Sequence, residues 1–244
     1  MNGSGLGLGL GRGEGTGRGM RGLGHGADAT LMSRERRVLA ACPTPRATQR
    51  WVDAVAYNHE ERGETLRGFR GVVRSGTAHC AEAALAAAVP LERLGHRPRL
   101  LDLRSPDRMD HFCALWRDRD GRWGAVAQSK YPGLRGRRAV FATIPALVRS
   151  YVDPFVDGTG EVEAWAVYDL SRHPRPWRLA SGNVWHVQHA VNRLPHARVR
   201  TSRAHVEALR TRYVRWKRAR GVDPGDHALE PPVAFYPGLR RVVL

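Results

Sequence analysis

The alanine-rich run of residues 80–89 begins with Cys80, at a point where the chain is expected to start a helix. In the first turn of a helix, a thiol faces unpaired backbone N–H groups and the positive end of the helix dipole. Both favour the thiolate, which is the reactive form of cysteine. Cys80 is therefore predicted to be a nucleophile, and the alternative interpretation is a small buried hydrophobic residue at a helix start.

A histidine follows the cysteine after about thirty residues. Residues 110–116 form a pattern typical of a strand that carries His111, and a turn at 118–121 leads to a second strand at 122–127. A cysteine at a helix start, then a histidine on a strand with a hairpin partner, is the chain order of a Cys–His acyl-transfer site. His111 is thus predicted to be the general acid and base. The alternative is a capped strand histidine.

This order, with these residues, resembles the transglutaminase-like superfamily, whose fold belongs to the papain-like cysteine proteases. The resemblance runs from about residue 71 to 126, with a looser match to about 157. Four stretches are similar to a bacterial branch of that superfamily, namely residues 57–64, 78–84, 121–130 and 149–155. The resemblance implies an acyl-enzyme on Cys80, with the N–H of Cys80 as one donor to the oxyanion. It implies no cofactor.

The third member of the usual catalytic set is replaced. Families of this kind place an aspartate after the second strand, in a pattern similar to Gly-x-Trp-x-x-Val-Asp. Here Gly121, Trp123 and Val126 fit the pattern, and Ala127 occupies the position of the aspartate. Alanine cannot accept a hydrogen bond from an imidazole, so another group must orient His111.

Two neighbours of Ala127 are candidates for orienting His111. Alternation along a strand places Ser129 on the same face as residue 127, and Gln128 would replace it if a bulge shifted the register. Ser129 is the first predicted orienting residue and Gln128 the second. Because a neutral group stabilises imidazolium less than a carboxylate does, slow turnover or none is expected.

Other polar residues near these positions allow further interpretations. A zinc site could be imagined from His79, Cys80, His111 and Cys113. Yet the chain lacks C-x-x-C or H-x-x-x-H spacing, so no metal site is predicted. Asn58 and Arg70 could offer an oxyanion donor or bind a carboxylate, although capping or surface roles are favoured. Glu82 lies in the first helical turn, where it complements the dipole.

The order of the elements indicates an α+β fold. The helix from Cys80 precedes a buried strand at 99–103 and the two hairpin strands, which together form a sheet for the helix to pack on. Further predicted elements are a helix at 47–57, a helix at 144–151 ended by Asp153 and Pro154, a strand at 161–170, and helices capped by Ser181 and by Thr201 or Ser202. We expect a papain-like, transglutaminase-like core with a helix packed on an antiparallel sheet and a helical C-terminal portion.

Three segments are predicted along the chain. Residues 1–32 are expected to be a disordered tail, because 12 of the 27 glycines lie in the first 26 residues. The pattern Gly-x-Gly-x-x-Gly at 17–22 has no strand before it, so no dinucleotide cofactor is predicted. Residues 33–170 are expected to form the transglutaminase-like core. Residues 171–244 are expected to be a helical, basic portion of the same domain.

Charge and cysteine content bear on partners and compartment. The 40 basic residues exceed the 23 acidic ones, giving a net charge of +17, and all but two of the basic residues are arginine. The favoured interpretation is a solvated, arginine-rich surface. The alternative, which applies above all to residues 198–220, is a surface that binds nucleic acid. Three cysteines and no apparent signal peptide favour reduced thiols in the cytoplasm. No apolar run is long enough to span a membrane.

Together these patterns predict a thiol-dependent amide-bond hydrolase or acyl transferase that uses Cys80 and His111 on a peptide or other amide substrate. The acyl group would pass to water or to an amine. Two alternatives stay open: a catalytically impaired transglutaminase-like binding module, and a basic protein that binds nucleic acid.

Overall fold

The computed structural model describes residues 30–244 and combines helices with a central antiparallel sheet. The sheet has the strand order β6-β5-β4-β3-β7-β8, and every neighbouring pair is antiparallel. Its strands are β3 (Arg99–Arg104), β4 (His111–Arg117), β5 (Trp123–Val126), β6 (Arg137–Phe141), β7 (Ala164–Asp169) and β8 (Ala197–Arg198). Two short strands, β1 (Ala56–Tyr57) and β2 (Thr77–Ala78), pair in parallel beside it.

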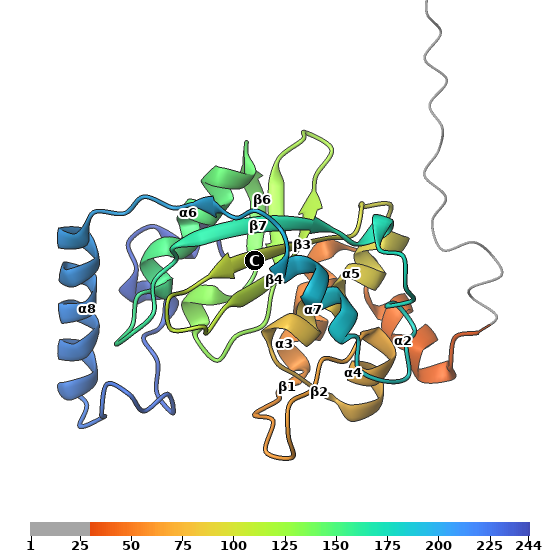
Figure 1. Ribbon diagram of the computed structural model, residues 1–244, viewed down its shortest axis with the longest axis horizontal. Helices are drawn as coiled ribbons and strands as arrows, with labels where there is room; N and C mark the ends of the chain where they lie inside the picture. The colour runs from red at the N-terminus through yellow and green to blue at the C-terminus, as the bar shows by residue number, and fades with distance from the viewer. Residues whose placement is uncertain (1–29) are drawn as a thin grey trace, which may run out of the picture.

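Seven α-helices occur in residues 30–244 (Figure 1). They are α2 (Ser33–Ala41), α3 (Pro45–Ala54), α4 (Phe69–Ser75), α5 (Cys80–Arg93), α6 (Ile144–Phe155), α7 (Trp185–Asn192) and α8 (Arg203–Arg218). Helix α8 stands at one end of the molecule, and α2 lies at the other end. None of the helices in the described range is long and apolar enough to cross a membrane.

Both faces of the sheet are covered, as the alternation of side chains along its strands requires. Leu100 of β3 and Ala114 of β4 belong to the core cluster that includes α5, α4 and α7. Leu101 of β3 and Leu115 of β4 face the opposite way, into the cluster that includes α6. The predicted packing of the Cys80 helix on an antiparallel sheet is confirmed.

Helix α5 is the central helix of the larger core cluster. Its row of alanines is almost completely buried, and small side chains let the helix approach the sheet closely. The chain passes through Pro90 without leaving the helix, and Gly95, at φ +89°, follows its end. Residues 91–93 thus form the final turn of α5.

Three predicted helix boundaries are wrong. The helix expected at 47–57 is α3 (Pro45–Ala54), and residues 56–57 form strand β1 instead because they pair with β2. Helix α6 continues past Pro154 to Phe155. Proline cannot donate to the carbonyl of Ser150, but that carbonyl accepts a hydrogen bond from Nη2 of Arg137 at 3.1 Å, so its acceptor capacity is still used. Helix α7 does not begin at a Ser181 cap. It follows Val184, whose N–H donates instead to the carbonyl of Leu66.

The predicted start of α8 is confirmed, but the burial of one of its basic side chains was not expected. Ser202 caps the helix by accepting a hydrogen bond from the N–H of His205 at 3.2 Å. Val206 and Tyr213 are buried, and Lys217 is also fully buried. Its ammonium group donates to the carbonyl of Leu229 at 2.6 Å and to Glu230 at 3.2 Å, so the C-terminal segment covers this side of the helix.

The predicted glycine-rich tail falls mainly on residues 1–29, which lie outside the described residues. Residues 30–32 are described, and Leu31 is buried in the larger core cluster. The packed part of the chain therefore begins before the predicted boundary at residue 32.

Candidate active site

Cys80 is the first residue of α5, with His79 as the N-cap. The parallel pairing of β1 with β2 fixes the segment that leads into the helix, since Tyr57 pairs with Ala78. The thiol is half-buried, and in its neutral form it donates to the carbonyl oxygen of Asp110 at 3.6 Å. Helix geometry gives the N–H of Cys80 no intrahelical acceptor, so this donor is free for an oxyanion.

His111 is the first residue of β4 and is only 3% exposed. Its Nε2–H donates to the carbonyl oxygen of Leu134 at 2.8 Å, which leaves Nδ1 as the nitrogen available to a thiol. Cys80 and His111 line one small cleft of about 70 Å³, together with Tyr57 and Ser129. The structure therefore brings the two predicted residues, thirty-one positions apart in the sequence, into one cleft.

The electrostatics favour an ion pair between them. Burial alone would raise the pKa of the Cys80 thiol, but hydrogen bonds and positive charge from His111 and His79 lower it to about 6. Burial also opposes the imidazolium of His111, yet the neighbouring sulfur atoms of Cys113 and Cys80 raise its pKa to about 10. Both shifts favour a thiolate and an imidazolium at neutral pH. We assign the proton exchange to Cys80 because Cys113 is fully buried.

His79 is a second imidazole beside the thiol, and the sequence interpretation missed its role. Its Nε2 donates to the carbonyl of Thr65 at 2.9 Å, and the carboxylate of Glu60 lies 3.6 Å away. Burial lowers the pKa of His79, but the Cys80 sulfur, the Thr65 carbonyl and Glu82 together raise it to about 9. His79 therefore lies beside the sulfur and helps to lower the pKa of the thiol, while its Nδ1 accepts from the N–H of Ala81 at 3.3 Å.

The predicted orienting residues do not contact the imidazole of His111. The hydroxyl oxygen of Ser129 accepts from the N–H of Tyr131 at 3.1 Å, although Ser129 does line the cleft. The amide of Gln128 points to α3 and donates to the carbonyl of Val52 at 3.3 Å. The contact comes instead from the main chain of Leu134, in the short 3-10 turn η1 (Pro132–Leu134). A backbone acceptor carries no side-chain signal, so residue types could not reveal it.

Tyr57 also lines the cleft, and the sequence interpretation missed it. Burial, the charge of Cys80 and that of Glu60 all raise the pKa of its hydroxyl, so the phenol stays protonated. A protonated phenol in the same cleft as the nucleophile is a candidate second donor to an oxyanion. Its place follows from the β1–β2 pairing, which no local pattern in the sequence predicts.

Glu82 does more than complement the helix dipole. Its side chain is fully buried and accepts from Nε of Arg67 at 2.6 Å, from the hydroxyl of Thr65 at 2.8 Å and from the amide of Asn58 at 3.1 Å. It also accepts from the N–H of His79 at 3.2 Å, completing a capping box. Glu82 therefore ties the loop before α4 to the start of α5.

These contacts assign structural positions to Asn58 and Arg70. Asn58 belongs to the Glu82 cluster, and Arg70 forms an ion pair with the buried Glu35 at 2.7 Å. Neither lines the cleft. Among residues 30–244, no group of three or more His, Cys, Asp or Glu side chains could hold a metal ion, and the described cysteines are all free thiols.

The cleft thus contains a thiol with a lowered pKa, an imidazole whose Nε2 is held by a main-chain carbonyl, and a protonated phenol. Comparison of the chain with protein-family models gives no match, and comparison with curated proteins finds no similar protein.

Proposed function

We propose that the protein is a thiol-dependent amide-bond hydrolase or acyl transferase with a transglutaminase-like, papain-like core. One observation carries the proposal: the Cys80 thiol, at the start of α5, shares a cleft with an imidazole whose far nitrogen is held by the Leu134 carbonyl. The free thiols of Cys42, Cys80 and Cys113 support action in a reducing compartment, for which we propose the cytoplasm.

The proposed reaction uses groups already in place. The Cys80 thiolate attacks the amide carbonyl carbon, and the N–H of Cys80 and the hydroxyl of Tyr57 stabilise the oxyanion. The C–N bond breaks as Nδ1–H of His111 protonates the leaving amine, which gives a thioester on Cys80. Water or an amine then attacks the thioester, loses a proton to His111 and releases the acyl group from the sulfur.

The orienting group sets an expectation for the rate. A neutral carbonyl holds the imidazole tautomer but stabilises the imidazolium less than a carboxylate would. Slow turnover follows from Ala127 and from this replacement. The small volume of the cleft, about 70 Å³, favours a second candidate, a transglutaminase-like module that binds a ligand and has impaired catalysis.

Acylation of the thiol tests the proposal. We expect p-nitrophenyl acetate to release a burst of nitrophenol equal to the protein concentration, with an acetyl group found on Cys80 by mass spectrometry after acid quenching. Cys80→Ser should abolish the burst, because a hydroxyl lacks the low pKa of this thiol. Cys42→Ser, which changes a buried thiol outside the cleft, is the matched control and should leave the burst unchanged.

Adding methylamine to the acetylated protein after the excess ester has been removed separates the two acyl acceptors, since N-methylacetamide then forms only if the thioester passes to an amine. A protein that folds normally but is not acetylated at Cys80 would contradict the enzyme and leave the binding module as the better account.

A further inference from the structure

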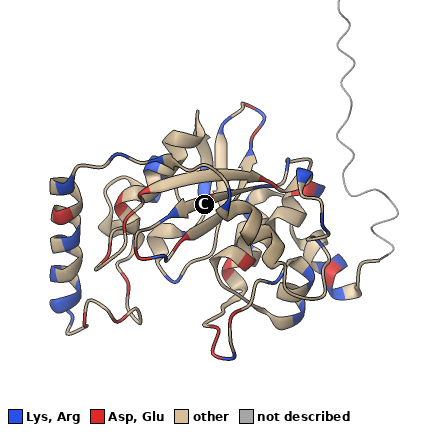
Figure 2. Ribbon diagram, viewed as in Figure 1, with Lys and Arg blue, Asp and Glu red and all other residues tan. Residues whose placement is uncertain are grey.

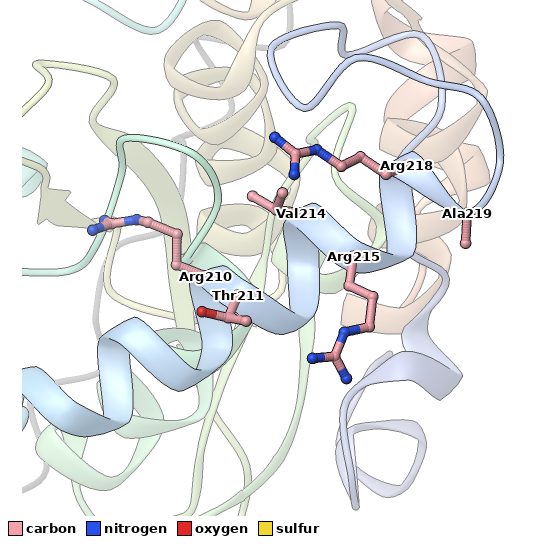
Figure 3. A pocket seen from close by; sticks show the side chains of 6 residues that line it. All are labelled: Arg210, Thr211, Val214, Arg215, Arg218 and Ala219. Atoms are coloured by element: carbon pink, nitrogen blue, oxygen red, sulfur yellow. The ribbon is translucent and has the colours of Figure 1, made fainter.

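Helix α8 presents an arginine-rich face to solvent at one end of the molecule (Figure 2). Along that face runs a shallow hollow of about 640 Å³, lined only by residues of α8 and its C-cap. Arg210, Arg215 and Arg218 project from this face, with Thr211 and Val214 between them (Figure 3). The face is therefore a broad surface feature that other elements leave open.

The charge of this face is not neutralised locally. Arg215 and Arg218 are exposed, and their guanidinium groups form no hydrogen bond or ion pair within residues 30–244. Glu207 is the only acidic residue of α8, and the buried partner Glu230 contacts Lys217 on the inward side. Two guanidinium groups are therefore available to bind an external anion.

Neighbouring contacts hold the face in place and extend it. The Nε of Arg210 donates to the carbonyl of Asp157 at 3.1 Å, which anchors the helix to the loop after α6. The guanidinium of Arg220 stacks on the ring of Trp216 at 4.1 Å, and that of Arg212 lies over Phe235 at 4.0 Å. Stacking restricts the motion of these guanidinium groups but leaves their positive charge unneutralised.

The face lacks what an anionic membrane surface would need. An interfacial helix carries large apolar residues that enter the lipid. Within the described residues, the exposed large apolar side chains are Met32, Met109, Val140 and Leu229, none of which lies on α8. The apolar residues Val206 and Tyr213 of α8 are buried in the protein. Charge without apolar anchors favours a hydrophilic polyanion.

We propose that the outer face of α8 binds the phosphate backbone of duplex nucleic acid, with Arg215 and Arg218 as the main contacts. A helix fits the major groove of a duplex, and guanidinium groups pair with phosphate oxygens in a bidentate manner. Because backbone contacts carry no sequence information, the binding is expected to be independent of sequence. This inference does not depend on catalysis at Cys80.

The test is fluorescence anisotropy of a short labelled duplex with the full chain, titrated over about 50 to 200 mM salt. Arg215→Glu combined with Arg218→Glu should weaken binding by at least about tenfold and reduce the slope of log K against log salt by about 2. Arg215→Gln with Arg218→Gln should show the same reduction in slope with a smaller loss of affinity.

The matched control replaces Arg46 and Arg50, two exposed arginines one turn apart on α3, by glutamate. It alters the net charge by the same amount and should change affinity by less than about threefold. Equal loss in both variants would show that net charge alone attracts the duplex, and overturn the proposal. Absence of duplex binding, or stronger binding to phosphatidylserine vesicles through the same arginines, would also overturn it. Cys80→Ser should bind the duplex like the unaltered protein.

Discussion

His111→Ala is expected to slow alkylation of Cys80 at neutral pH by at least about fourfold. The pKa of this thiol is about 6, although burial alone would raise it above its ordinary value of 9.0, and contacts with His111 and then His79 produce the lowering. Removing His111, the larger contribution, should restore more than half of the difference between the thiol pKa of about 6 and the ordinary 9.0. At a pH below the pKa, each unit by which the pKa rises reduces the thiolate fraction tenfold.

The measurement is the rate of iodoacetamide reaction at Cys80, followed by mass spectrometry across the pH range. In the unaltered protein the rate should level off above about pH 6, whereas in His111→Ala it should keep rising to pH 8 and beyond. His189→Ala, which removes an exposed histidine from α7, is the control and should give the unaltered profile. Superimposable profiles for His111→Ala and the unaltered protein would remove His111 from the proposed site.

The second large effect concerns stability. Arg67→Met is expected to lower the free energy of unfolding by about 3 to 5 kcal/mol, because it leaves the carboxylate of Glu82 buried without its main partner. Arg178→Met is the matched control. The Arg178–Glu92 pair is also bidentate but more exposed, so its loss should cost about 1 kcal/mol or less. Urea denaturation measures both values.

The pH dependence sharpens this test. Burial raises the pKa of Glu82, but Arg67, His79 and the surrounding donors lower it to about 2. A lowered folded-state pKa means that the contribution of Glu82 to stability is complete above its ordinary value of 4.5 and is lost as the pH falls through about 2. Without Arg67 the folded-state pKa rises, so the variant should recover part of its deficit on acidification. A deficit that stays constant from pH 7 to pH 4 would contradict the assigned role of Glu82.

Local patterns in the sequence were sufficient for the elements that carry the site. The alanine run predicts α5, and the alternation around residues 110–127 predicts the β4–β5 hairpin, both of which the structure confirms. Chain order then predicted that Cys80 and His111 meet, and they line one cleft. That they catalyse a reaction remains a prediction.

The parts that the sequence could not predict depend on contacts between distant segments. Helix α6 passes through Pro154 because Arg137, from a neighbouring strand, donates to the carbonyl of Ser150. Glu82 is identifiable as a residue of the first helical turn, but its cluster requires the fold of the loop before α4. The partner of His111 is a main-chain atom, whereas the residues considered for that role were chosen by their side chains.

The acceptor at Leu134 has a consequence for how this site changes over generations. A carbonyl oxygen is common to all twenty amino acids, so no codon change at position 134 can delete it. Only a shift in the path of the turn η1 would withdraw it from the imidazole. Selection on this contact would therefore act on residues that shape the turn, such as Pro132 and Gly133. Substitutions there would move the carbonyl and inactivate the site without changing any reactive side chain.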